Sequence, residues 1–153
     1  MVAPRILVDA DACPVKEEIY KVAFRHEVKV TLVTNQHLRV PPHSLIERIT
    51  VGAGFDAADD WIAGATGADA VVITTDILLA DRCLKAGAAA VISPTGKPFT
   101  DASIGSAVAT RAIMADLRAG MGEGVGGPAP FSKADRSRFL QALDEALVRA
   151  KRG

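Results

Sequence analysis

The sequence contains few of the residues that define several specialised classes of protein. Only two of its 153 residues are cysteine, Cys13 and Cys83, too few for a disulfide framework and not in a CxxC motif. Aromatic residues make up 5% of the chain, which argues against a base-stacking surface for single-stranded nucleic acid. No apolar run approaches the roughly 20 residues that cross a bilayer, and acidic residues come too early for an N-terminal secretory signal. We therefore expect a cytoplasmic protein that does not enter a membrane.

An excess of charge of either sign is also missing. Eighteen Lys and Arg residues balance eighteen Asp and Glu residues, which excludes bulk attraction to a polyanion but leaves room for a local basic patch. Apolar residues form 49% of the chain, enough to build a core and to exclude disorder of the whole chain. The length suits one domain.

Short apolar runs alternate with helical patterns along the chain. We predict strands at residues 5–8, 28–34, 70–74 and 88–92, with a short extended piece at 46–51. We predict one helix that starts at Pro14 and further helices at 56–65, 77–86 (ended by Gly87), 103–119 and 132–149. This alternation is typical of an α/β fold with three layers, in which helices cover both faces of a mainly parallel sheet.

The chain divides into three segments within this one fold. Residues 1–119 form the α/β domain, residues 120–131 are a glycine-rich connector, and residues 132–153 form a basic C-terminal helix of the same domain. Two interpretations of this helix are open. It lies over an acidic edge of the sheet and supplies a phosphate-binding surface, or its basic residues form a solvated face and tail.

The residues that follow the predicted strands indicate where an active site lies. In an open parallel sheet, ligands bind beyond the carboxyl ends of the strands. Asp9 and Asp11 follow the first strand, Asn35 follows the second, and Asp76 follows the third. Carboxylates gathered at one edge repel each other, and a divalent cation relieves that repulsion.

A long acidic segment leads to the same expectation. Residues 49–81 contain six aspartates and no Lys or Arg. Asp56, Asp59 and Asp60 lie at helical spacings that place them on one face. Because Cys and His are not at ligand spacings and carboxylate oxygens are hard ligands, the pattern predicts Mg²⁺ or Mn²⁺ rather than zinc.

Structural explanations of the same acidic residues stay open at this point. Asp76 precedes a helix and can serve as its N-cap, and Asp9 or Asp11 can cap the first helix in the same way. Asp59 and Asp60 can be solvated surface residues.

Three further residues have two interpretations each. Cys13 lies near a helix N-terminus and is either a reactive thiol or a small residue packed at a tight turn. Lys16 and Arg39 either contact substrate phosphate, together with Asn35, or lie on a solvated face.

Several ordered motifs resemble the YaiI/YqxD family of uncharacterised bacterial proteins. They are VDADACP at 8–14, NQ at 35–36, RVPP at 39–42, GFDAAD at 54–59, TTDI at 74–77, LA at 79–80 and GGP at 126–128. Leu78 departs from the family pattern, which usually has proline there. The family is grouped with PIN-like domains, which are metal-dependent ribonucleases. The resemblance therefore implies a PIN-like fold, with Asp9, Asp11, Asp59 and Asp76 as metal ligands.

Three functions follow as hypotheses. In the first, the protein is a nuclease in which Asp9, Asp11 and Asp76 are catalytic and a bound Mg²⁺ or Mn²⁺ activates water to cleave RNA or DNA. The second is a phosphatase resembling the haloacid-dehalogenase group, with Asp9 as nucleophile. That group needs a lysine, and the sequence has none at 30–84, which leaves only Arg39 or Arg48. The third is a module that binds RNA or protein without catalysis.

Overall fold

The computed structural model describes residues 3–52, 54, 56–106 and 131–152. Its centre is a sheet of five strands: β1 (Arg5–Asp9), β2 (Lys29–Thr34), β3 (Ile46–Thr50), β4 (Ala70–Ile73) and β5 (Ala90–Ile92). The strands are parallel and lie in the order β3-β2-β1-β4-β5. The first strand of the chain is therefore the middle of the sheet, and its end lies between the ends of β2 and β4.

Side chains alternate between two cores along each inner strand. Ile6 and Val8 of β1 belong to one buried cluster, whereas Leu7 belongs to a second cluster on the other face. All three are at most 1% exposed. Burial on both faces explains why these strands are continuous apolar runs in the sequence.

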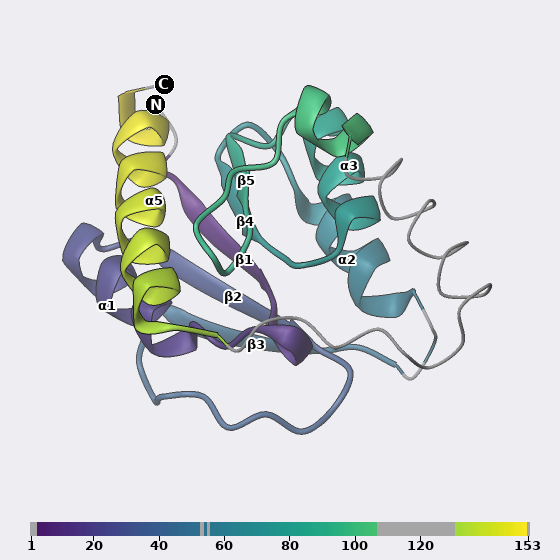
Figure 1. Cartoon of the computed structure of the whole chain (residues 1–153). Helices are drawn as coiled ribbons and strands as arrows, with labels where there is room; N and C mark the ends of the chain where they lie inside the picture. The colour runs from purple at the N-terminus through teal and green to yellow at the C-terminus, as the bar shows by residue number, and fades with distance from the viewer. Residues whose placement is uncertain (1–2, 53, 55, 107–130, 153) are drawn as a thin grey trace, which may run out of the picture.

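Helices cover both faces, which confirms the three-layer α/β architecture expected from the sequence. Helices α1 (Lys16–His26) and α5 (Lys133–Arg152) lie on one side of the sheet, and α2 (Ala57–Ala65) and α3 (Ile77–Lys85) lie on the other (Figure 1). α5 packs along α1 and against β4 and β5. The bulky residues of α5 that enter the core are Phe139, Leu143 and Leu147, one turn apart and fully buried.

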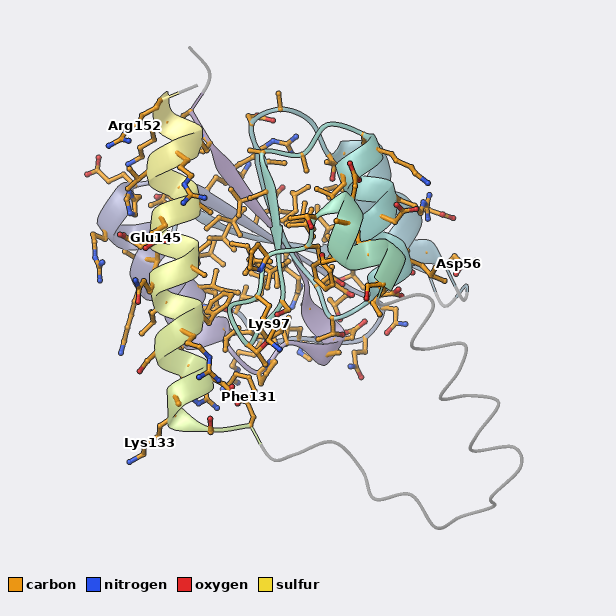
Figure 2. All side chains as sticks on the ribbon, turned by 45° about the horizontal axis from the view of Figure 1, so that its top comes forward. Asp56, Lys97, Phe131, Lys133, Glu145 and Arg152 are labelled. Atoms are coloured by element: carbon orange, nitrogen blue, oxygen red, sulfur yellow. The ribbon has the colours of Figure 1, made fainter. Side chains whose placement is uncertain are left out.

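The position of α5 bears on the two interpretations of the basic C-terminal segment. Figure 2 shows α5 on the opposite side of the molecule from Asp56, which precedes α2. Arg136 of α5 donates to Glu18 of α1 at 2.9 Å and to the Pro14 carbonyl, also at 2.9 Å. The helix therefore covers the α1 side of the sheet, and none of its described residues lines the pocket that the aspartates form at the carboxyl edge.

A tight turn after β5 also contacts α5. Gly96 has a φ of +87°, and a Cβ atom placed there would lie 2.6–2.8 Å from backbone atoms of Arg138 and Phe139. The turn therefore needs glycine both for its backbone conformation and for the close approach of α5.

Local predictions were mostly confirmed, with several corrections. The predicted extended piece at 46–51 is β3, a full edge strand paired with β2. The first helix begins at Lys16 rather than at Pro14, because residues 10–12 form a 3₁₀ turn that delays it. Gly87 has the positive φ expected after the end of α3. Residues 101–106 are helical, two residues earlier than predicted, whereas residues 107–119 and most of the connector at 120–131 lie outside the described residues.

Candidate active site

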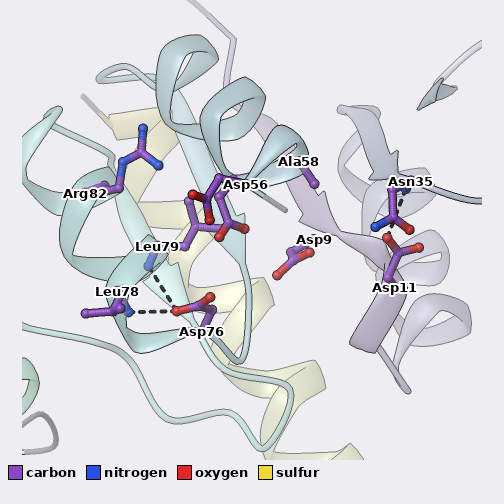
Figure 3. A pocket seen from close by; sticks show the side chains of 10 residues that line it. Asp9, Asp11, Asn35, Asp56, Ala58, Asp76, Leu78, Leu79 and Arg82 are labelled. Atoms are coloured by element: carbon purple, nitrogen blue, oxygen red, sulfur yellow. Dashed lines mark hydrogen bonds between the residues drawn. The ribbon is translucent and has the colours of Figure 1, made fainter. Parts of the chain in front are cut away.

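An acidic pocket lies at the carboxyl edge of the sheet, where β1, β2 and β4 end. It has a volume of about 460 Å³, and Figure 3 shows the side chains that line it. Its lining residues are Asp9, Asp11, Asn35, Asp56, Ala58, Asp59, Asp76, Leu78, Leu79 and Arg82. The structure thus brings together the aspartates that follow two of the strands, Asp9, Asp11 and Asp76, and two of the three that the sequence places on one helix face, Asp56 and Asp59.

Asp9, at the end of β1, is the central carboxylate of this pocket. Its Oδ2 accepts a hydrogen bond of 2.9 Å from the hydroxyl of Thr74, which follows β4. The same hydroxyl accepts a bond of 3.0 Å from the backbone N–H of Asp76. Burial raises the pKa of Asp9, the Thr74 hydrogen bond opposes that shift, and the negative charges of Asp76 and Asp11 add to it.

Asp11 is held on the other side of Asp9 by the end of β2. Its carboxylate accepts hydrogen bonds from the Thr34 hydroxyl, from the Asn35 backbone N–H at 3.0 Å and from the Gln36 amide at 3.2 Å. Desolvation acts to raise the pKa of Asp11, but these hydrogen bonds and the charge of Lys16 outweigh it and lower that pKa. Asp11 is therefore a fixed, ionised carboxylate.

Asp59 reaches the pocket from α2, on the opposite face of the sheet from α1. Burial, followed by the charges of Asp76, Asp9 and Asp56, raises its pKa to about 6. Its neighbour Asp60 forms an ion pair of 2.9 Å with Arg82 instead of lining the pocket. The sequence analysis left both Asp59 and Asp60 as solvated surface residues or site residues, and only Asp59 lines the pocket.

Asp76 both caps a helix and lines the pocket. Its Oδ1 accepts hydrogen bonds from the backbone N–H groups of Leu78 at 2.8 Å and Leu79 at 3.3 Å, so the N-cap interpretation is confirmed. The corresponding interpretation of Asp9 and Asp11 is wrong. Val15 occupies the N-cap position of α1, and no side chain caps that helix.

Lys16 and Arg39 do not line the acidic pocket but meet in a second cavity of about 330 Å³. We call this cavity the Lys16–Arg39 pocket. Its lining residues are Lys16, Glu17, Tyr20, Arg39, Val40, Pro41 and Pro42. Lys16 donates to the Cys13 carbonyl at 2.9 Å. Burial raises the pKa of the Cys13 thiol, which favours the packing interpretation of that residue over a reactive thiol.

Sequence reasoning missed three residues of the site. Thr34 and Thr74 are at most 1% exposed and orient Asp11 and Asp9. The sequence did contain a signal for these two residues, because each is a threonine at the carboxyl end of an apolar strand, where ligands bind in a parallel sheet. Arg82 lies one helical turn after Leu78 and is the first basic residue after the acidic segment.

The donor set matches a hard divalent cation in chemistry, because the pocket offers carboxylate oxygens and no sulfur or imidazole. The raised pKa values of Asp9 and Asp59 indicate negative charge that Arg82 does not fully compensate. In the described part of the chain, no three Asp, Glu, His or Cys side chains are already arranged around one ion position.

Comparison with known proteins identifies the family. A family model described as "Uncharacterized BCR, YaiI/YqxD family" matches residues 7–149. The chain belongs to this family. A relative from Sphingopyxis alaskensis, named "UPF0178 protein", is 75% identical over 100% of the chain and 99% of its own length. Another of the same name, from Nitrobacter winogradskyi, is 59% identical over 99% of the chain and 96% of its own length.

No solved structure matches the chain. Among the described helices, none combines the length and apolar content that crossing a membrane requires.

Proposed function

We propose that the protein is a phosphodiesterase that depends on Mg²⁺ or Mn²⁺ and hydrolyses RNA or DNA. One observation carries the proposal. Carboxylates from β1, α2 and the start of α3 converge on one pocket, where their mutual repulsion adds to burial in raising the pKa of Asp59 to about 6. Stability alone does not explain such a cluster, whereas a cation and a phosphate placed there would relieve the repulsion. The resemblance of the family to PIN-like ribonucleases supports the same function.

Asp9, Asp59 and Asp76 are the residues that would hold the cation, with Asp11 beside them. Thr74 orients Asp9 and the backbone of Asp76, while α3 fixes the Asp76 carboxylate through its first turn. Arg82 provides a positive charge on the α3 side of the pocket. When bound, the cation lowers the pKa of a water molecule and stabilises the charge that develops on the phosphate.

The arrangement favours water over Asp9 as the nucleophile. Burial raises the pKa of Asp9, and Thr74 already occupies one of its oxygens. The two arginines considered as substitutes for the phosphatase lysine lie elsewhere, since Arg39 lines the second pocket and Arg48 donates to the Leu38 carbonyl.

Calorimetric titration of Mn²⁺ into the metal-free protein tests the proposal. We expect saturable binding to the unmodified protein, a loss of affinity of at least about tenfold in Asp9→Asn and Asp59→Asn, and no change in Asp81→Asn. Asp81 is the matched control, because it pairs with Lys85 on α3 and does not line the pocket.

Hydrolysis of single-stranded RNA and DNA oligonucleotides in Mn²⁺ is the second part of the test. We expect cleavage by the unmodified protein and by Asp81→Asn, and none by Asp9→Asn. Mn²⁺ binding without hydrolysis of either polymer would overturn the proposal in favour of a non-catalytic binding module. Equal cleavage by Asp9→Asn and the unmodified protein would also overturn it.

A further inference from the structure

The lining of the Lys16–Arg39 pocket has a net positive charge, in contrast to the acidic pocket. Two cationic side chains, Lys16 and Arg39, line it together with one carboxylate, that of Glu17. The lining therefore carries one net positive charge in a molecule whose total charge is zero. A single phosphodiester, which carries one negative charge, complements this balance.

Tyr20 provides an independent observation at the same place. It lines the pocket and is only 5% exposed, yet its hydroxyl makes no hydrogen bond to any described residue. The hydroxyl is also not sealed in the core, since no buried side-chain oxygen or nitrogen in the described residues lacks a partner. A largely buried tyrosine normally satisfies its hydroxyl. The hydroxyl of Tyr20 instead reaches solvent, and because Tyr20 lines the pocket, this hydroxyl is available to a ligand there.

The two pockets are lined by the same two chain segments. The segment after β1 contributes Asp11 to the acidic pocket and Lys16 to the second one. The loop after β2 contributes Asn35 to the first and Arg39 to the second. Lys16 donates to the carbonyl of Cys13, two residues after Asp11, so its ammonium group lies near the Asp11 end of the acidic pocket. The charge of Lys16 also lowers the pKa of Asp11. A nucleic-acid strand can therefore occupy both at once.

We propose that the Lys16–Arg39 pocket binds the phosphate of the nucleotide adjacent to the one in the acidic pocket. Lys16 and Arg39 form charge-assisted hydrogen bonds to the phosphate oxygens, and Tyr20 donates its hydroxyl to one of them. Val40, Pro41 and Pro42 form an apolar wall for the sugar or base. This inference rests on the proposed function, because its ligand is the same strand.

Tyr20 is the single tyrosine of the sequence, which makes the pocket directly observable. Protein labelled with 3-fluorotyrosine gives one ¹⁹F resonance, and we would titrate it with a five-nucleotide single-stranded RNA in EDTA. We expect a saturable shift of this resonance, and no shift with adenosine, which has no phosphate.

Fluorescence anisotropy of a labelled oligonucleotide then measures the contribution of each side chain. We expect affinity to fall about tenfold in Arg39→Ala and about fivefold in Tyr20→Phe, which keeps the ring packed. Lys21→Ala is the matched control, because it removes one positive charge from the same helix outside the pocket lining. We expect that variant to bind within about twofold of the unmodified protein.

The outcomes separate this inference from the proposed function. An unshifted Tyr20 resonance, or equal affinities of Arg39→Ala and Lys21→Ala, would overturn the subsite even if the protein cleaves RNA in Mn²⁺. Conversely, binding that depends on Arg39 and Tyr20 without any cleavage would support the subsite and overturn the nuclease proposal.

Discussion

Asp59 illustrates at the scale of one residue how a functional pocket opposes stability. The side chain is half-buried on α2 and lies near three other carboxylates. Its pKa rises from an ordinary value of 3.8 to about 6 because burial and these charges disfavour ionisation. The folded protein thus binds this proton more tightly than the unfolded chain does. Its stabilising contribution is complete below about pH 4 and is lost as the pH rises through 6.

We predict that Asp59→Asn stabilises the metal-free protein at pH 7. The amide removes a repelling charge, and solvent screening of this half-exposed position limits the gain to about 1 kcal/mol. The gain should shrink toward zero as the pH is lowered from 7 to 4. Urea denaturation at several pH values measures it. Asp81→Asn, outside the pocket, should show no such pH-dependent gain, and an Asp59→Asn protein less stable than the unmodified one at pH 7 would contradict the argument.

At the scale of the secondary-structure element, the first turn of α3 shows how one residue, Asp76, serves both helix stability and the acidic pocket. Asp76 satisfies the first backbone N–H groups of the helix and also contributes a charge to the acidic pocket. The two roles are separable, because asparagine caps helices about as well as aspartate but carries no charge.

We predict that Asp76→Asn and Asp76→Ala differ in stability but not in function. In metal-free protein, Asp76→Ala should lose about 1 kcal/mol of unfolding free energy through the missing cap, whereas Asp76→Asn should stay within about 0.5 kcal/mol. Both should lose Mn²⁺ affinity. Denaturation and calorimetry on the same samples check this. If Asp76→Asn keeps full Mn²⁺ affinity, Asp76 is a cap and nothing more.

At the scale of the whole molecule, the turn at Gly96 fixes how α5 lies against the end of β5. Any side chain there meets the α5 backbone at Arg138 and Phe139, and the backbone conformation itself disfavours other residues. Neither partner is a flexible side-chain tip, so the strain cannot be relieved locally. The sheet and the last helix must separate slightly to accept a methyl group.

We predict that Gly96→Ala destabilises the protein by about 3 kcal/mol, the sum of backbone strain and overpacking. Gly87→Ala is the matched control. Gly87 has nearly the same φ, +88° against +87°, but a Cβ atom added to it would have nothing within 4 Å. That variant should lose only about 1 kcal/mol. Equal losses in the two variants, measured by thermal or urea denaturation, would show that contact with α5 contributes nothing.

The sequence predicted the buried strands and part of the acidic pocket, because both depend on local patterns of apolar and acidic residues. Apolar runs identified the buried strands, and the residues after them identified Asp9 and Asp76 at one edge of the sheet. It could not predict that the extended piece at 46–51 pairs with β2 as the edge strand β3, because alternating exposure gives a weak signal at an edge, or that the turn at Gly96 touches α5. Thr74 was also missed, because its partner Asp9 is 65 residues away in the chain. Contacts of this kind depend on strand order, which local patterns do not encode.

The order in which the chain is made gives the packing of α5 a further consequence. During translation, all five strands and α1 emerge before α5, so one face of the sheet has only α1 to cover it in the meantime. The nascent chain must hold this apolar surface apart from other chains until Phe139, Leu143 and Leu147 arrive. Slow release of the α5 segment, or a premature stop before it, should therefore increase aggregation and dependence on chaperones more than the loss of one surface helix suggests.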